Sequence, residues 1–354
     1  MEEHTRQRNL AISRTAFLKN CEHAFSAYTN MGWQREPGSP ADFSDADIAA
    51  IEVGADDAHW SSAANNRTND AALDVAVLRA ADELHRDACV TNATWAVLEA
   101  KLSTEQCVDM VASIGHYTLN SMLLNTLGVQ ADFPGKKGHT YPGFRDRAGE
   151  VPGDCTGPRP ASARITPIEY NDSRSKRINV LKTMNKHKDM NRRWMSWASY
   201  VLSDPAEDGR AVSRRLTEVA ILRVGWLLNA TYEWHQHVRM AKEDTDITDD
   251  DIRAIQVGAS DLRWNAEEKA LLTMVDELRS YSCVSDATWA ALTAVFSHKQ
   301  IMDLVGATGQ YTLVSFMLNS FGVELEDDGT APLHNDGTTP RWGPNGADFR
   351  PDAH

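Results

Sequence analysis

Hydrophobic residues recur along most of the chain at the three- and four-residue spacing of amphipathic helices. No stretch alternates with period two for long enough to indicate a strand. Several Ser and Thr residues precede the helical runs, often with an acid or glutamine two or three residues later, which is a helix-start signal. These predicted N-caps are Ser44, Thr91, Ser103, Thr248, Ser285 and Ser297. Gly128 and Gly322 are expected to end two long helices, so the pattern predicts an all-α fold.

The sequence also repeats within itself. The matched segments are 11–21 with 220–230, 43–60 with 247–264, and 82–128 with 276–322. The last pair aligns without a gap, and about half of its positions are identical, far more than shared composition would give. Residues 177–213 have no counterpart in the first copy. The repeat predicts a tandem duplication.

The chain of 354 residues has room for two domains. The predicted parts are a degenerate first copy at 1–130, a Pro/Gly-rich linker at 131–163, a complete second copy at 164–328 and a polar, flexible tail at 329–354.

Composition and charge exclude several classes of function. A net charge of −14 argues against binding nucleic acid or an anionic membrane surface. No apolar run approaches the length of a membrane span, and the N-terminus lacks the core of a signal peptide, so we expect a soluble, cytoplasmic protein. The five cysteines are scattered without a C-x-x-C motif, which favours neither a disulfide framework nor a zinc site.

Candidate chemistry gathers between residues 215 and 241, in a segment dense with apolar residues. Glu233 and His237 are four residues apart and share one face of a helix, whereas His235 points elsewhere. Glu218 lies fifteen residues before Glu233 and can reach this pair only if the chain turns between them. We expect Asn229 to mark that turn and to cap the second helix.

The spacing E-x11-A-x2-E-x3-H, from Glu218 through Ala230 and Glu233 to His237, resembles the signature of the carboxymuconolactone decarboxylase/AhpD-like superfamily. The resemblance extends over residues 164–326. It implies two tandem AhpD-like helical domains and a homo-oligomer, because single-domain relatives assemble as trimers and hexamers. In the peroxidase branch, the positions of Ala230 and Glu233 hold a redox cysteine pair. Neither is cysteine here, which argues against thiol chemistry in this half.

The resemblance implies a lyase or decarboxylase that needs no cofactor or metal. An isomerase or a hydrolase that uses the same residues is also compatible with the resemblance. The substrate would be small and would carry a carboxylate or a lactone, with or without an aromatic ring. His237 would be the general acid/base, Glu233 its partner or a second acid/base, and Glu218 a supporting carboxylate. The alternatives are an AhpD-like hydroperoxide reductase and a non-catalytic binding or assembly protein, in which Glu233 and His237 only satisfy each other in the core.

Four further residues are predicted to bind the substrate. Tyr232 and Trp234 flank the pair and would form an aromatic wall. Arg223 would either form a buried ion pair with Glu218 or hold a substrate carboxylate. Tyr311 lies in the long apolar helix near the end of the second copy.

The first copy lacks this acid/base set. The alignment places Asn9 near the position of Glu218, Ala24 opposite Glu233 and Tyr28 opposite His237. The segment Cys21-Glu22-His23 matches Ala230-Thr231-Tyr232 in this alignment. A shift of the alignment by two positions would set Glu22 opposite Glu233. Whether the first copy has a site is left open, as is the meaning of His116, which matches Gln310.

Overall fold

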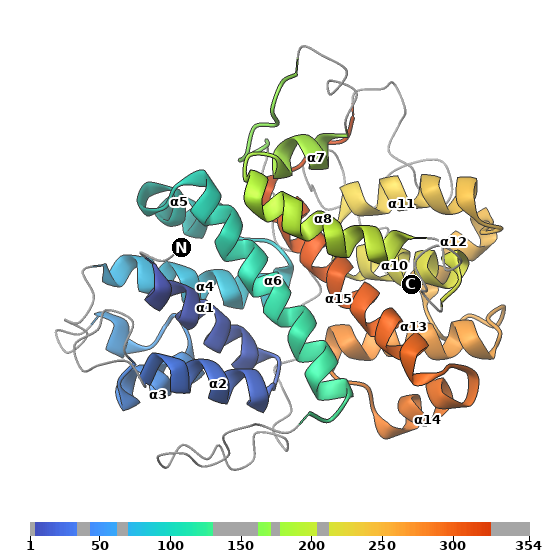
Figure 1. Cartoon of the computed structure of the whole chain (residues 1–354), viewed down its shortest axis with the longest axis horizontal. Helices are drawn as coiled ribbons and strands as arrows, with labels where there is room; N and C mark the ends of the chain where they lie inside the picture. The colour runs from blue at the N-terminus through green and yellow to red at the C-terminus, as the bar shows by residue number, and fades with distance from the viewer. Residues whose placement is uncertain are drawn as a thin grey trace, which may run out of the picture.

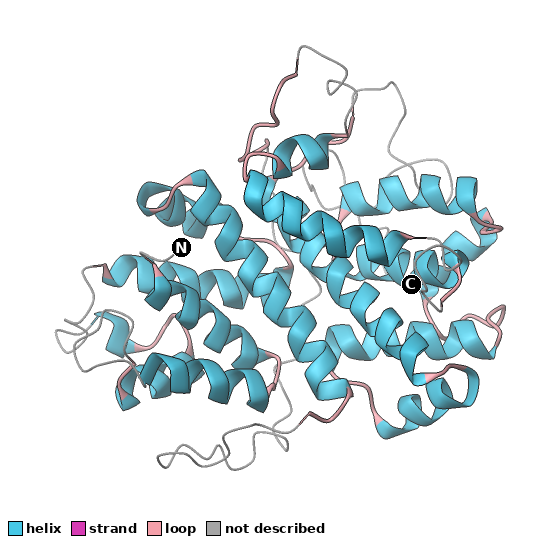
Figure 2. Cartoon of the chain, viewed as in Figure 1, coloured by secondary structure: helices cyan, strands magenta, loops and turns pink. Residues whose placement is uncertain are grey.

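The computed structural model describes residues 4–33, 43–61, 70–129, 162–170, 178–203 and 212–326. Within these ranges the chain is helical and has no strand, so the all-α prediction is confirmed for them (Figure 2). The first half contains α1 (Thr5–Leu18), α2 (Glu22–Trp33), α3 (Asp45–Val53), the short 3-10 helix η1 (Ala58–Ser61), α4 (Ala71–Asp87), α5 (Asn92–Lys101) and α6 (Thr104–Thr126). The second contains α7 (Asn179–Met184), α8 (Lys188–Leu202), α10 (Arg214–Leu227), α11 (Thr231–Asp244), α12 (Asp249–Val257), α13 (Ala266–Tyr281), α14 (Asp286–Val295) and α15 (His298–Phe321).

The six predicted N-caps are confirmed. Each side chain accepts a hydrogen bond from the backbone N–H three residues later. Such a cap contributes about 1 kcal/mol to helix stability. Gly128 and Gly322 both have φ of +64°, in the left-handed region that ends helices, and Gly322 is the C-cap of α15.

The long helices α6 and α15 form the most extensive helix pair and lie together at the centre of the molecule (Figure 1). Helices α1–α5 lie on one side of this pair, and α10–α14 lie in a matching order on the other. Helices α7 and α8 have no counterpart among the described residues of the first half, and α8 packs on α15 and α10.

Two glycines let α6 and α15 approach closely. A Cβ atom added to Gly115 would lie 3.0 Å from Cα of Leu313, and one added to Gly309 would lie 2.9 Å from Cα of Leu119. In the sequence repeat Gly115 matches Gly309 and Leu119 matches Leu313. The contact is therefore reciprocal, as across the two-fold axis of a symmetric dimer.

An Arg–Asp ion pair braces each half in the same way. Arg14 donates from Nε to Asp82 at 2.6 Å and from Nη1 to two carbonyls at the end of α3. Arg223 donates from Nε to Asp276 at 2.7 Å and from Nη1 to two carbonyls at the end of α12. The predicted pairing of Arg223 with Glu218 is therefore wrong: the two share α10, but Arg223 faces α12 and α13.

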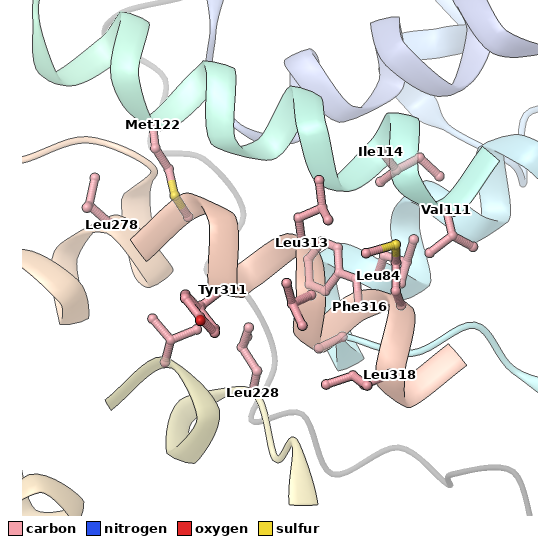
Figure 3. Close-up of a cluster of buried hydrophobic side chains, with 14 of the residues drawn as sticks. Leu84, Val111, Ile114, Met122, Leu228, Leu278, Tyr311, Leu313, Phe316 and Leu318 are labelled. Atoms are coloured by element: carbon pink, nitrogen blue, oxygen red, sulfur yellow. The ribbon is translucent and has the colours of Figure 1, made fainter. Parts of the chain in front are cut away.

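The apolar residues of the last helices are covered within the chain. Leu313, Phe316 and Met317 of α15 are buried. In Figure 3, Leu313 points toward α6, on which Val111 and Ile114 lie. The α6–α15 pair therefore covers these residues inside one chain.

No helix in the described ranges combines the length and apolar character needed to cross a membrane. The predicted linker, apart from residues 162 and 163, and the predicted tail lie outside the described residues.

Gly309→Ala tests the close approach of α6 and α15. We expect a loss of about 1–3 kcal/mol in the free energy of unfolding, because the methyl group meets the backbone of Leu119. The gain in helix propensity, about 1 kcal/mol, opposes this loss. Urea unfolding measures the difference.

Gly306→Ala is the matched control on the same helix. Its added Cβ would meet only the ring of Trp197, at 3.2 Å, and this half-exposed side chain can move aside. We expect unchanged or slightly higher stability. Equal unfolding free energies for the two variants would contradict the proposed role of the glycine contact.

Candidate active site

A sharp turn between α10 and α11 brings the predicted acid/base residues together. Asn229 has φ of +52°, a left-handed conformation that asparagine tolerates better than most residues. The chain therefore reverses at the predicted residue. The predicted cap is one residue out, because Ala230 occupies the N-cap position and offers no side-chain hydrogen bond.

His237 lies between two buried carboxylates. Its Nδ1 is 2.8 Å from Oε2 of Glu218 on α10, and its Nε2 is 3.0 Å from Oε1 of Glu233 one turn earlier on α11. Glu218 is fully buried, and Glu233 and His237 are 4 % and 5 % exposed. The Glu233 contact is an ion pair without good hydrogen-bond geometry, so Oε1 can also accept from another group.

Arg214 balances the second oxygen of Glu218. Its Nη2 lies 2.8 Å from Oε1, and its Nη1 donates to the carbonyl of Leu202 at the end of α8. The prediction missed Arg214, although its spacing of four residues before Glu218 is an available signal. Arg214 thereby joins the buried carboxylate to the helix that covers the site.

The pKa of His237 reflects two opposing causes. Burial alone would lower it, because desolvation disfavours the charged ring. The negative charges of Glu218 and Glu233, with the hydrogen bond to Glu218, outweigh burial and raise the pKa to about 10. The imidazole is therefore protonated at neutral pH and can act as a proton donor.

Glu233 and His237 line a cavity of about 460 Å³, which lies in the size range of small-molecule sites. Its other polar lining residues include Tyr232, Gln236, Gln310 and Tyr311. The apolar lining comes mainly from α7, α8 and α15 and includes Ile178, Leu181, Trp194, Met195, Val314 and Leu318. Helix α8 crosses α15 in Figure 1, and both helices line the cavity together with α11.

Tyr232 lines the cavity, and its hydroxyl donates to Glu326 at 2.6 Å. Gln236 and the backbone N–H of Asn179 donate to the same carboxylate. Burial, and then the charge of Glu326, raise the pKa of the Tyr232 phenol, so it stays protonated. Glu326, which the prediction missed, thus ties α7 and α11 together beside the cavity.

Tyr311 also lines the cavity, and its ring meets the His237 ring edge-on with centroids 4.8 Å apart. The other two predicted substrate-binding residues lie elsewhere. Trp234 is buried against Trp226, and Arg223 faces Asp276; neither lines the cavity. Tyr232 and Gln236, four residues apart, lie on the cavity face of α11, and Trp234, midway between them in sequence, points to the opposite side.

The first half has a different group at the matching place. Tyr28 and Tyr117 meet edge-on with ring centroids 4.8 Å apart, and their hydroxyls contact each other. Tyr117 matches Tyr311 in the repeat, so Tyr28 stands where His237 stands. Asn20, at the α1–α2 turn, has the same φ as Asn229, which supports this alignment over the shifted one. Glu22 is therefore not the counterpart of Glu233.

The other first-half residues whose role the sequence left undecided do not form an acid/base group like that of Glu218, Glu233 and His237. Burial raises the pKa of the Cys21 thiol, which disfavours the reactive thiolate. Glu22 and His23 line a separate small cavity with Cys283. His116 is exposed on α6, whereas its counterpart Gln310 is 2 % exposed. Among the described residues, no group of three His, Cys, Asp or Glu side chains could hold a metal ion.

Comparison with protein families bears on this site directly. Residues 189–276 match the carboxymuconolactone decarboxylase family. The matched segment runs from α8 into α13 and includes Glu218, Glu233 and His237. The carboxymuconolactone decarboxylase match leaves out the first half and α15, which supplies Gln310 and Tyr311. Comparisons with curated proteins and with solved structures gave no match.

The raised pKa of His237 predicts how stability depends on pH. The contribution of the imidazolium is fully present below its unfolded pKa of 6.5 and is lost as pH rises through the folded value of about 10. The unfolding free energy of the wild-type protein should therefore fall between these two pH values. Denaturant unfolding at a series of pH values measures the slope.

His237→Gln removes the titrating ring and serves as the comparison. Other groups that titrate in this range are common to both proteins, so the slope should be shallower in the variant. Parallel slopes would show that the His237 charge is not stabilised by its two carboxylates.

Proposed function

We propose that the chain is a lyase that removes carbon dioxide from a small substrate held beside Glu233 and His237. Isomerisation or lactone hydrolysis by the same pair is the variant of this proposal. The observation that carries it is the buried, protonated His237 between two carboxylates on a cavity wall. The carboxymuconolactone decarboxylase match over the same residues supports the reaction class. A shared fold alone would not, since one fold hosts many reactions.

The proposed step balances without a cofactor. The bond from the carboxylate carbon to its neighbour breaks, and carbon dioxide leaves. The electron pair passes into a conjugated carbonyl of the substrate and forms an enolate. His237 then donates a proton to the enolate carbon, and the ring regains a proton from solvent. Glu218 orients the imidazole through Nδ1, and Glu233 relays the returning proton from the cavity side.

The arrangement gives no support to a hydroperoxide reductase. Ala230 and Glu233 stand where that branch has its cysteines. Cys21 occupies the place of Ala230 in the first half, but Ala24 follows where a second cysteine would stand. Burial also raises the pKa of Cys21. A reactive thiolate pair is therefore not available at either position.

We further propose that the two halves arose by duplication and that only the second kept acid/base chemistry. The reciprocal glycine contacts of α6 and α15 support this history, as do the two equivalent Arg–Asp pairs. Tyr28 in place of His237 accounts for the loss in the first half.

Carbon dioxide release from carboxymuconolactone tests the reaction. Glu233→Gln and His237→Gln should each lower kcat/KM by about 100-fold or more, because each removes a proton-transfer group. Tyr28→Phe changes the matched position in the first half and should leave the rate near that of the wild-type protein.

Three results would contradict the proposal. Unchanged rates in Glu233→Gln and His237→Gln would remove the site assignment. Folded wild-type protein that releases no carbon dioxide from this lactone or related unsaturated lactone acids would remove the lyase assignment. Consumption of a hydroperoxide that iodoacetamide abolishes would favour the reductase instead.

A further inference from the structure

Gln310 is a buried polar residue that the acid/base mechanism above does not use. It lies on α15, is 2 % exposed and lines the same cavity as Glu233 and His237. Within the described part of the chain, its Nε2 has no hydrogen-bond acceptor. A buried N–H donor without an acceptor lowers the stability of the fold, so its presence calls for a reason.

Two other buried amide side chains donate to acceptors within the protein. The Asn319 amide, nine residues later on α15, donates to the carbonyls of Ala88 and Leu228. The Gln236 amide lines the same cavity as Gln310 but donates to Glu326. Asn319 and Gln236 thus find protein acceptors, whereas Nε2 of Gln310 has none among the described residues.

The neighbourhood of Gln310 indicates what that molecule offers. The next residue, Tyr311, packs its ring edge-on against His237, so Gln310 lines the wall beside the proton donor. On the same cavity, Oε1 of Glu233 lacks a hydrogen bond of good geometry. The cavity thus presents an N–H donor and a proton-accepting carboxylate, which suits a carbonyl compound that forms an enolate.

We propose that Gln310 donates a hydrogen bond to the carbonyl oxygen of the substrate, where negative charge collects in the enolate. This inference deepens the proposed function and rests on it. It names the substrate class as small ketones, esters or lactones and assigns Gln310 as the residue that selects them. The apolar part of the substrate would pack against Trp194, Met195 and Val314.

The first half lacks this arrangement. Its matching residue is His116, which is exposed because no described helix takes the place of α7 and α8 there. The second half therefore has a buried amide donor in its cavity, whereas the first half has an exposed histidine at the matching position. This difference between His116 and Gln310 coincides with the presence of the cavity in the second half.

Binding of two matched probes tests the inference without turnover. Phthalide is a small aromatic lactone, and indane has the same bicyclic skeleton without oxygen. Dissociation constants for both are measured by protein NMR titration with the wild-type chain, Gln310→Met and Gln236→Met. Methionine keeps the length of glutamine and removes the amide. Thermal unfolding of the three proteins gives a second readout.

We expect wild-type protein to bind phthalide about tenfold more tightly than indane, the discrimination of one good hydrogen bond. Gln310→Met should bind both with similar affinity and melt no lower than wild type, because it removes an unpaired donor. Gln236→Met should melt lower, because it leaves Glu326 without one of its donors.

Wild-type protein that binds phthalide no better than indane would overturn the inference, and so would a Gln310→Met variant that keeps the preference. Melting of Gln310→Met well below wild type would also overturn it, since the amide would then be structural. Failure of the lyase proposal is separate: it appears as absent carbon dioxide release while the Gln310-dependent preference for phthalide persists.

Discussion

The buried carboxylate of Glu218 is the constraint on which the candidate site depends. A fully buried negative charge is stable only when it is paired. Arg214 supplies one partner from the same helix, and His237 supplies the other from the next. His237 reaches Glu218 only because the chain reverses at Asn229. The turn at Asn229, the ion pairs of Glu218 and the protonated imidazole of His237 therefore depend on one another.

The charges of these groups balance. Arg214 and His237 carry positive charge, and Glu218 and Glu233 carry negative charge. Of these four residues, Glu233 and His237 line the cavity, and Arg239 adds a positive charge to the same lining. Polar groups that are fixed in place before a reaction stabilise charge that forms during it.

The two halves share a scaffold and differ in what covers it. The α6–α15 pair and the two Arg–Asp pairs are equivalent in both halves. Among the described residues, helices in the place of α7 and α8 occur in the second half alone, where they line the cavity with α11 and α15. The candidate site therefore depends on added elements as much as on the repeated ones.

The sequence by itself determined the all-helical class, six N-caps, the turn at Asn229 and the spacing that joins Glu218, Glu233 and His237. These follow from local rules of periodicity, capping and turn conformation, which a single segment contains. Only the tertiary structure decided which face of a helix meets which neighbour. It turned Arg223 toward Asp276.

The same reason explains the residues that were missed. Glu326 is distant in sequence from Tyr232, and Gln310 is buried only because α8 lies nearby in space. Such contacts join segments far apart in the chain, and helical periodicity fixes the faces of each helix but not their partners.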